Sequence, residues 1–130
     1  MGQQNYLIDT NTAIEYIGAT LPEKSLNLLD TIIDDSFFLS VINKIELRGF
    51  YGLNREEEQK FNQLIESSTL ISLEDAIIER TIALRKATRI KLPDAIIAAT
   101  ALEYDLTIIT RNIKDFEQLP DIQLINSYSI

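Results

Sequence analysis

Short apolar runs alternate along the chain with longer segments of helical pattern. Five of these runs are rich in β-branched or aromatic residues and are bounded by polar ones, which is typical of strands. We predict strands at residues 6–8, 37–40, 69–73, 106–110 and 122–125. Because helical patterns separate them, we expect an α/β protein of three layers, in which helices cover both faces of a central parallel sheet.

The segments between the predicted strands carry apolar residues at helical spacing. We predict helices at residues 22–34, 54–67, 75–88 and 95–102. The third has two apolar stripes, Ile78 with Ile82 and Ile77 with Leu84. The fourth is apolar nearly all round, which indicates a helix buried in the core.

Composition limits the chemistry that the chain can perform. Its 130 residues are 45% hydrophobic and contain no repeat or flexible linker, so we expect one domain over residues 1–130. No apolar run is long enough for a membrane span and residues 1–5 lack a signal-peptide pattern, so we expect a cytoplasmic protein. The formal charge of −8 argues against nonspecific binding to phosphate backbones. The absence of cysteine and histidine excludes disulfides, thiolate sites and imidazole catalysis, which leaves carboxylates, hydroxyls, amides, Lys, Arg and Tyr.

Three acidic residues follow strands or open the buried helix, at the edge where open parallel sheets bind ligands. Asp9 directly follows the first strand, Asp115 lies beyond the fourth, and Asp94 follows Pro93 at the start of the buried helix. Each has a structural alternative. Asp9 suits a helix cap, Asp94 suits a first helical turn, and Asp115 suits a surface position in a short turn capped by Asn112.

A fourth acid, Glu46, lies within a helical stripe. Ile42, Ile45, Gly49 and Phe50 recur at helical spacing, and we expect this stripe to face the core with Glu46 on it. A carboxylate in that position needs a partner, a hydrogen bond or a metal ion. The alternative is that Glu46 lies at the edge of the stripe and pairs with a basic neighbour.

All four acids belong to segments that end or begin at one edge of the predicted sheet, so we expect a convergent acidic pocket. Oxygen ligands without histidine or cysteine favour Mg²⁺, with Mn²⁺ as a further option, over zinc or copper.

Four motifs in this order resemble the PIN domain, and more closely the VapC-type toxin ribonucleases of toxin–antitoxin pairs. They are LIDTN at residues 7–11, SVINKIEL at 40–47, LPDAIIAATAL at 92–102 and LTIITRNIKDF at 106–116. The resemblance implies that the metal site and its catalytic acids are Asp9, Glu46, Asp94 and Asp115. It also implies supporting polar roles for Asn11, Thr110 and Asn112.

The resemblance further implies a Mg²⁺-dependent endoribonuclease toxin with an antitoxin partner and a homodimeric state. A basic cluster just before Asp94 is the candidate surface for the RNA backbone, and the alternative is a solvated helix face. Its candidate substrate-binding members are Arg85, Lys86, Arg89 and Lys91, with Arg80 one turn earlier.

Three rival functions stay open. A receiver-like signalling domain requires paired acids after the first strand, where Asp9 stands alone, and an acceptor after the third strand, where only Asp75 is available. A phosphatase that forms an aspartyl phosphate requires a second Asp at the position of Asn11. A catalytically inactive module of the same fold that binds RNA or protein is the third alternative.

Overall fold

The computed structural model describes residues 4–130. Most of the polar start at residues 1–5 therefore lies outside the described residues. Within the described part, five strands alternate with seven helices. In chain order the elements are β1 (Asn5–Ile8), α1 (Thr10–Ile17), α2 (Glu23–Asp35), β2 (Phe38–Ser40), α3 (Val41–Arg48), α4 (Arg55–Ser67), β3 (Thr69–Ile71), α5 (Asp75–Ala87), α6 (Leu92–Tyr104), β4 (Leu106–Thr110), α7 (Ile113–Phe116) and β5 (Gln123–Asn126).

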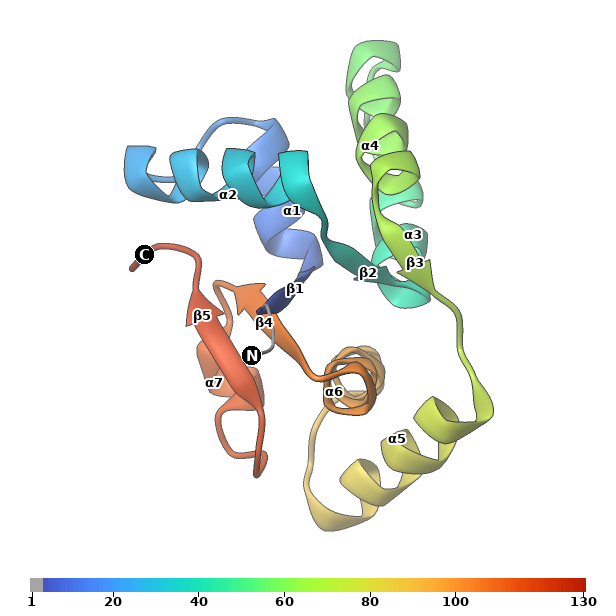
Figure 1. Cartoon of the computed structure of the whole chain (residues 1–130). Coiled ribbons are helices and arrows are strands. Elements are labelled where there is room, and N and C mark those ends of the chain that lie inside the picture. The colour runs from blue at the N-terminus through green and yellow to red at the C-terminus, as the bar shows by residue number, and fades with distance from the viewer. Residues whose placement is uncertain (1–3) are drawn as a thin grey trace.

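The strands form one sheet in the order β3-β2-β1-β4-β5, and every neighbouring pair is parallel. β1 lies at the centre, where Ile8 pairs with Ile109 of β4. Figure 1 shows helices α1, α2, α3 and α4 on one side of this sheet and α5 and α6 on the other. The predicted α/β fold with three layers and a five-stranded parallel sheet is confirmed.

Alternate residues of the central strands point to opposite faces of the sheet, which creates two hydrophobic cores. Leu7 and Ile108 pack against α5 and α6 in one core, whereas Ile8 and Ile109 pack against α1, α2 and α4 in the other. The central strands are therefore covered on both faces, as their continuous apolar sequences indicate.

Helix α6 is the most deeply buried helix. Every residue from 95 to 101 is buried, and small alanine side chains allow this close approach. The helix begins at Leu92, three residues earlier than predicted, because Pro93 is tolerated in a first turn. Helix α5 packs on α6 through Ile77 and Thr81. Its other predicted stripe, Ile78 and Ile82, is 37% and 44% exposed.

The predicted core face of α3 is wrong. Ile45 is 61% exposed and Phe50 is 46% exposed, whereas Asn43 and Leu47 are fully buried. Asn43 tolerates burial because both ends of its amide are hydrogen-bonded. The face of α3 that contains Asn43 and Leu47 therefore points into the protein. Glu46 consequently lies on the exposed side of α3.

No helix within residues 4–130 has both the length and the apolar character needed to cross a bilayer.

Candidate functional site

Asp9 is the buried centre of the acidic edge. It is the N-cap of α1, directly after β1, and only 5% of its surface is exposed. Its Oδ1 accepts a hydrogen bond of 2.9 Å from the Thr10 backbone N–H, and its Oδ2 accepts one of 2.8 Å from the Thr110 hydroxyl. Burial raises the pKa of Asp9, the charge of Glu46 adds to the rise, and these hydrogen bonds oppose it.

Thr110 and Asn11 form a polar frame around Asp9. The Thr110 hydroxyl accepts from the Asn112 backbone N–H at 3.0 Å and from Asn11 Nδ2 at 3.4 Å, so its single proton points to Asp9. Asn11 Nδ2 also lies 3.3 Å from Asp9 Oδ2, and its Oδ1 accepts from the Arg111 backbone N–H at 3.1 Å. The end of β4 is thereby fixed to the start of α1.

Asp94 lies in the first turn of α6, where the negative charges of the other three acids act on it. Burial raises the pKa of Asp94 to about 6, and the charges of Asp115, Asp9 and Glu46 contribute to the rise in that order. The positive charge of Lys91 lowers the same pKa. Three acids that are distant in sequence from Asp94 therefore act on its carboxyl group.

Glu46 and Asp115 lie at the exposed rim of this group. Glu46 Oε1 accepts a hydrogen bond of 2.6 Å from the Thr10 hydroxyl, and no ion pair of Glu46 occurs within residues 4–130. Asp115 is on α7, which begins after Asn112. The expected short turn is present, but the Asn112 side chain does not cap it.

The chemistry of the donors fits a hard divalent cation, since carboxylate oxygens are the ligands that Mg²⁺ and Mn²⁺ prefer. Burial and the charges of three neighbouring acids raise the pKa of Asp94, so a bound cation would stabilise its charged form. In the part of the chain that the structure describes, no three acidic side chains are arranged to hold a metal ion as they stand. The four acids therefore form an acidic cluster, and their side chains would have to move closer together to hold an ion.

The basic residues predicted to bind RNA have different contacts in the structure, and they do not form one continuous cluster beside the acids. Arg80 forms an ion pair of 2.6 Å with Glu103, near the end of α6, and Arg85 donates to the Ile90 carbonyl at 3.1 Å. Lys91 acts on Asp94 directly, whereas Lys86 and Arg89 are exposed. Lys91 is thus the member of the cluster whose charge lowers the pKa of one of the four acids, Asp94.

The structure adds two polar residues that the sequence pattern did not single out, Thr10 and Asn43. The Asn43 amide donates to the Thr10 hydroxyl at 3.0 Å, and that hydroxyl contacts Glu46. The available signal was Asn43 three positions after Ser40, which is the spacing of a capping box. Arg111 is a further addition, since its guanidinium pairs with Glu15 at 3.1 Å beside the site.

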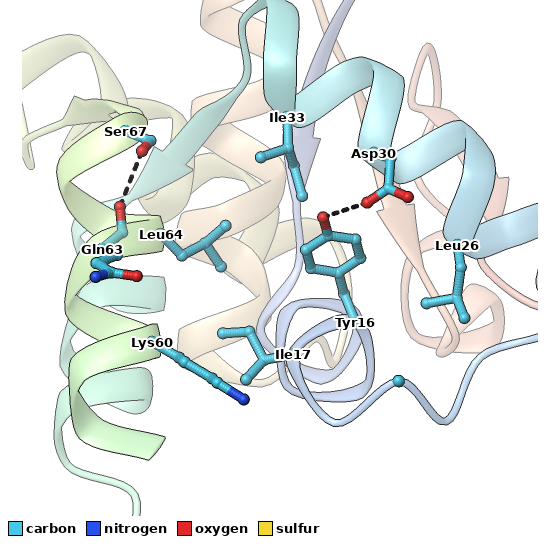
Figure 2. Close-up of a pocket in the computed structure, with 10 residues that line it drawn as sticks. Tyr16, Ile17, Leu26, Asp30, Ile33, Lys60, Gln63, Leu64 and Ser67 are labelled. Carbon is cyan, nitrogen blue, oxygen red and sulfur yellow. Dashed lines mark hydrogen bonds between the residues drawn. The ribbon is translucent and has the colours of Figure 1, made fainter. Parts of the chain in front are cut away.

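Two hollows differ in their relation to the acids. A cavity of about 490 Å³ adjoins the acidic edge and is lined by Arg111, Asn112, Ile113, Lys114, Asp115, Glu117 and Asn126. A groove of about 460 Å³ lies between α1, α2 and α4, where the Tyr16 hydroxyl donates to Asp30 at 2.5 Å (Figure 2). This second groove contains none of the four acids, so it is not part of the acidic centre.

Comparison with known proteins identifies the fold family. The family model of the PIN domain matches residues 6–122, a segment that contains all four acids. The chain belongs to the PIN domain family. No curated protein matches its sequence.

Solved structures agree with this family assignment. A chain of a toxin–antitoxin complex from Klebsiella pneumoniae is 30% identical to this PIN domain and superposes with a TM-score of 0.75. The match covers 97% of this chain and 100% of that chain. A chain of VapBC2 from Rickettsia felis, bound to a DNA fragment from its promoter, has 23% identity and a TM-score of 0.81, with 95% and 98% covered. A chain of VapBC-1 from nontypeable Haemophilus influenzae has 22% identity and a TM-score of 0.80, with the same coverage.

Proposed function

We propose that this PIN domain is a VapC-type toxin that hydrolyses RNA endonucleolytically with a divalent metal ion, Mg²⁺ or Mn²⁺. The observation that carries the proposal is the placement of Asp9 at the end of β1 and of Asp94 in the first turn of α6, where the charges of Asp9, Asp115 and Glu46 all raise the pKa of Asp94. The match to a toxin–antitoxin chain over nearly all of both chains supports the biological setting.

In this proposal Asp9 and Asp94 are the principal metal ligands, and Glu46 and Asp115 complete the set. A bound divalent ion supplies an acidified water and offsets negative charge in the transition state. Hydrogen bonds from Thr110 and from the backbone N–H of Thr10 oppose the rise in the pKa of Asp9, because hydrogen bonds to a carboxylate favour its charged form. Asn11 and Asn112 hold Thr110 in the required orientation.

RNA requires positive charge beside the acids. We assign this role to Lys91 on one side and to Arg111 and Lys114 of the adjoining cavity on the other. Exposed Lys86 and Arg89 extend the basic surface before α6. The Arg85 guanidinium already contacts the Ile90 carbonyl, so its first role is to hold the connection between α5 and α6.

The proposed toxin acts in the cytoplasm, where an antitoxin covers the acidic edge. We also propose a homodimer, which is supported by large apolar side chains that stay exposed on α3, in the connection before α5, on α5 and at the start of α6. They are Ile45, Leu73, Ile78, Ile82 and Leu92. Sedimentation of the wild type and of Ile82→Glu tests this assembly, and a monomeric wild type would contradict it.

The decisive experiment incubates purified wild type, Asp9→Asn and Asp75→Asn with a pool of RNA, in Mg²⁺, in Mn²⁺ and in chelator. Asp75 is the control because it is an exposed acid at the start of α5 and is not one of the four acids. Cleavage by wild type and Asp75→Asn in metal, and by neither in chelator, is expected. Equal cleavage by Asp9→Asn would contradict the assigned centre.

A binding module without catalysis is the second candidate, because residues 4–130 contain no preformed cage of three acids for a metal ion. RNA that is retained by the wild type but never cut in either metal would favour this candidate. Sequencing of the 5′ ends of cellular RNA after induction, in wild type and Asp94→Asn, separates the two functions in cells.

A further inference from the structure

A directional chain of hydrogen bonds leads from the end of β2 to Glu46. The Ser40 backbone N–H donates to Asn43 Oδ1 at 2.8 Å, Asn43 Nδ2 donates to Thr10 Oγ1 at 3.0 Å, and the Thr10 hydroxyl donates to Glu46 Oε1 at 2.6 Å. Ser40 and Asn43 are both fully buried. The chain therefore begins in the core and ends on an acid at the surface.

The orientation of each group in this chain is determined. A backbone N–H only donates, so the Asn43 atom that faces Ser40 is the amide oxygen, and the amide nitrogen must face Thr10. The Thr10 oxygen accepts that hydrogen bond, which leaves its single proton for Glu46. The arrangement thus presents a donor, and not an acceptor, to the Glu46 carboxylate.

This donor opposes a repulsive field. Glu46 lies on the exposed side of α3, and its charge acts on both Asp9 and Asp94. Without a counter-ion, repulsion between carboxylates favours a Glu46 side chain that extends into solvent. A hydrogen bond from a fixed hydroxyl to a charged oxygen counteracts this tendency.

Burial of the Asn43 side chain in α3 contributes no hydrophobic stabilisation, because a buried amide requires hydrogen-bond partners for both of its ends. The helix instead places Asn43 where an aliphatic residue would pack, and Leu47 one turn later completes the buried face. The Asn43 amide also lowers the pKa of Asp9, so it acts on two of the four acids.

We propose that Asn43 and Thr10 are positioning residues that hold Glu46 beside Asp9 and Asp94 before a divalent metal ion binds. This inference rests on the proposed metal-dependent function. Removal of either side chain should weaken the metal affinity, because removal of a group that orients a metal ligand typically lowers that affinity 10- to 100-fold.

The test is calorimetric titration of the purified chain with Mn²⁺ and with Mg²⁺. Thr10→Val keeps the shape of the side chain but removes its proton, whereas Thr10→Ser keeps a hydroxyl. Thr31→Val on α2 serves as the control for the same change at an exposed position, where the hydroxyl contacts only the Asn27 carbonyl of its own helix. We expect Thr10→Val to weaken the metal affinity about tenfold and Thr10→Ser to restore it.

A double-mutant cycle with Glu46→Gln tests whether Thr10 and Asn43 change the metal affinity through Glu46. If Thr10 acts through Glu46, then Thr10→Val produces little further loss of metal affinity in the Glu46→Gln background, and Asn43→Ala keeps only the part of its loss that acts through Asp9. An affinity of Thr10→Val equal to wild type, or an undiminished loss in that background, overturns the positioning role. Metal binding without RNA cleavage overturns the proposed ribonuclease alone, and a wild type that binds neither ion overturns both.

Discussion

The hydroxyl of Thr110 donates a 2.8 Å hydrogen bond to Asp9, although the two residues are 101 positions apart in the chain. They meet because β1 and β4 are adjacent and parallel, with Ile8 paired to Ile109, so both strands end at the same edge. The only proton of that hydroxyl is directed to the carboxylate because its oxygen already accepts from Asn112. One threonine thereby opposes the rise in the pKa of a buried acid.

Removal of this hydroxyl in Thr110→Val is expected to raise the pKa of Asp9 further and to weaken RNA cleavage at least tenfold. It should also lower the free energy of unfolding by about 1–3 kcal/mol, since Asp9 loses a buried donor. The control is Thr107→Val on the same strand, where the hydroxyl contacts Gln4 and Gln123 instead of an acid. Denaturant unfolding and cleavage rates give both measurements, and equal cleavage losses in the two variants would contradict the role of Thr110.

Replacement of Asp94 by Asn is expected to abolish cleavage and to raise the melting temperature in chelator. The reason is that Asp94 is partly buried and is repelled by three other acids, so removal of its charge relieves the metal-free fold. Loss of a favourable charge in a first helical turn opposes this gain. Asp75→Asn measures that opposing effect on α5, and a melting temperature of Asp94→Asn no higher than that of Asp75→Asn would count against close acid clustering.

The stability of the metal-free protein should fall as pH rises from about 4 to above 6. The pKa of Asp94 is raised to about 6 in the folded chain, so the folded state binds more protons than the unfolded state between its ordinary pKa of 3.8 and that value. The protonated Asp94 carboxyl therefore contributes folding stability that is fully present below its ordinary pKa of 3.8. This contribution is lost as the pH rises through about 6. Melting curves in chelator at several pH values should show a shallower fall for Asp94→Asn, and parallel curves would contradict this linkage.

The exposed cations before α6 should contribute to RNA binding through charge alone. In the double variant Lys86→Ala with Arg89→Ala, we expect weaker binding and a smaller dependence of the logarithm of affinity on the logarithm of salt concentration, by up to about 1.4. Arg55→Ala with Lys60→Ala removes two exposed cations from α4 and provides the matched control. The measurement is binding of RNA to an Asp9→Asn background at several salt concentrations, and identical slopes for both double variants would refute the assignment.

The sequence was sufficient to predict the elements that depend on strong local patterns. All five strands occur within two residues of their predicted bounds, because short β-branched runs between polar residues have few other solutions. The helices at 22–34, 54–67 and 75–88 were equally clear. The buried helix was predicted in place, and Pro93 and Asp94 were assigned to its start, as observed.

The face of α3 could not be predicted in this way. Eight residues provide only two helical turns, and the apolar stripe of Ile42 and Ile45 competes with a second face formed by Asn43 and Leu47. The spacing of apolar residues favours burial of the face with Ile42 and Ile45, because asparagine is usually found at the surface. The second face is buried because Ser40 and Thr10 satisfy the Asn43 amide, and Thr10 comes from a different part of the chain.

The sequence by itself determined the donor chemistry and the order of the parts: four acids in segments that meet at one sheet edge, with no histidine or cysteine to replace them. Only the tertiary structure decided how these acids interact. The order β3-β2-β1-β4-β5 brings the ends of β1 and β4 together, so Thr110 reaches Asp9, and it places α3 beside α1, so Thr10 reaches Glu46. Such contacts depend on residues that are 36 to 101 positions apart, and local propensity contains no information about them.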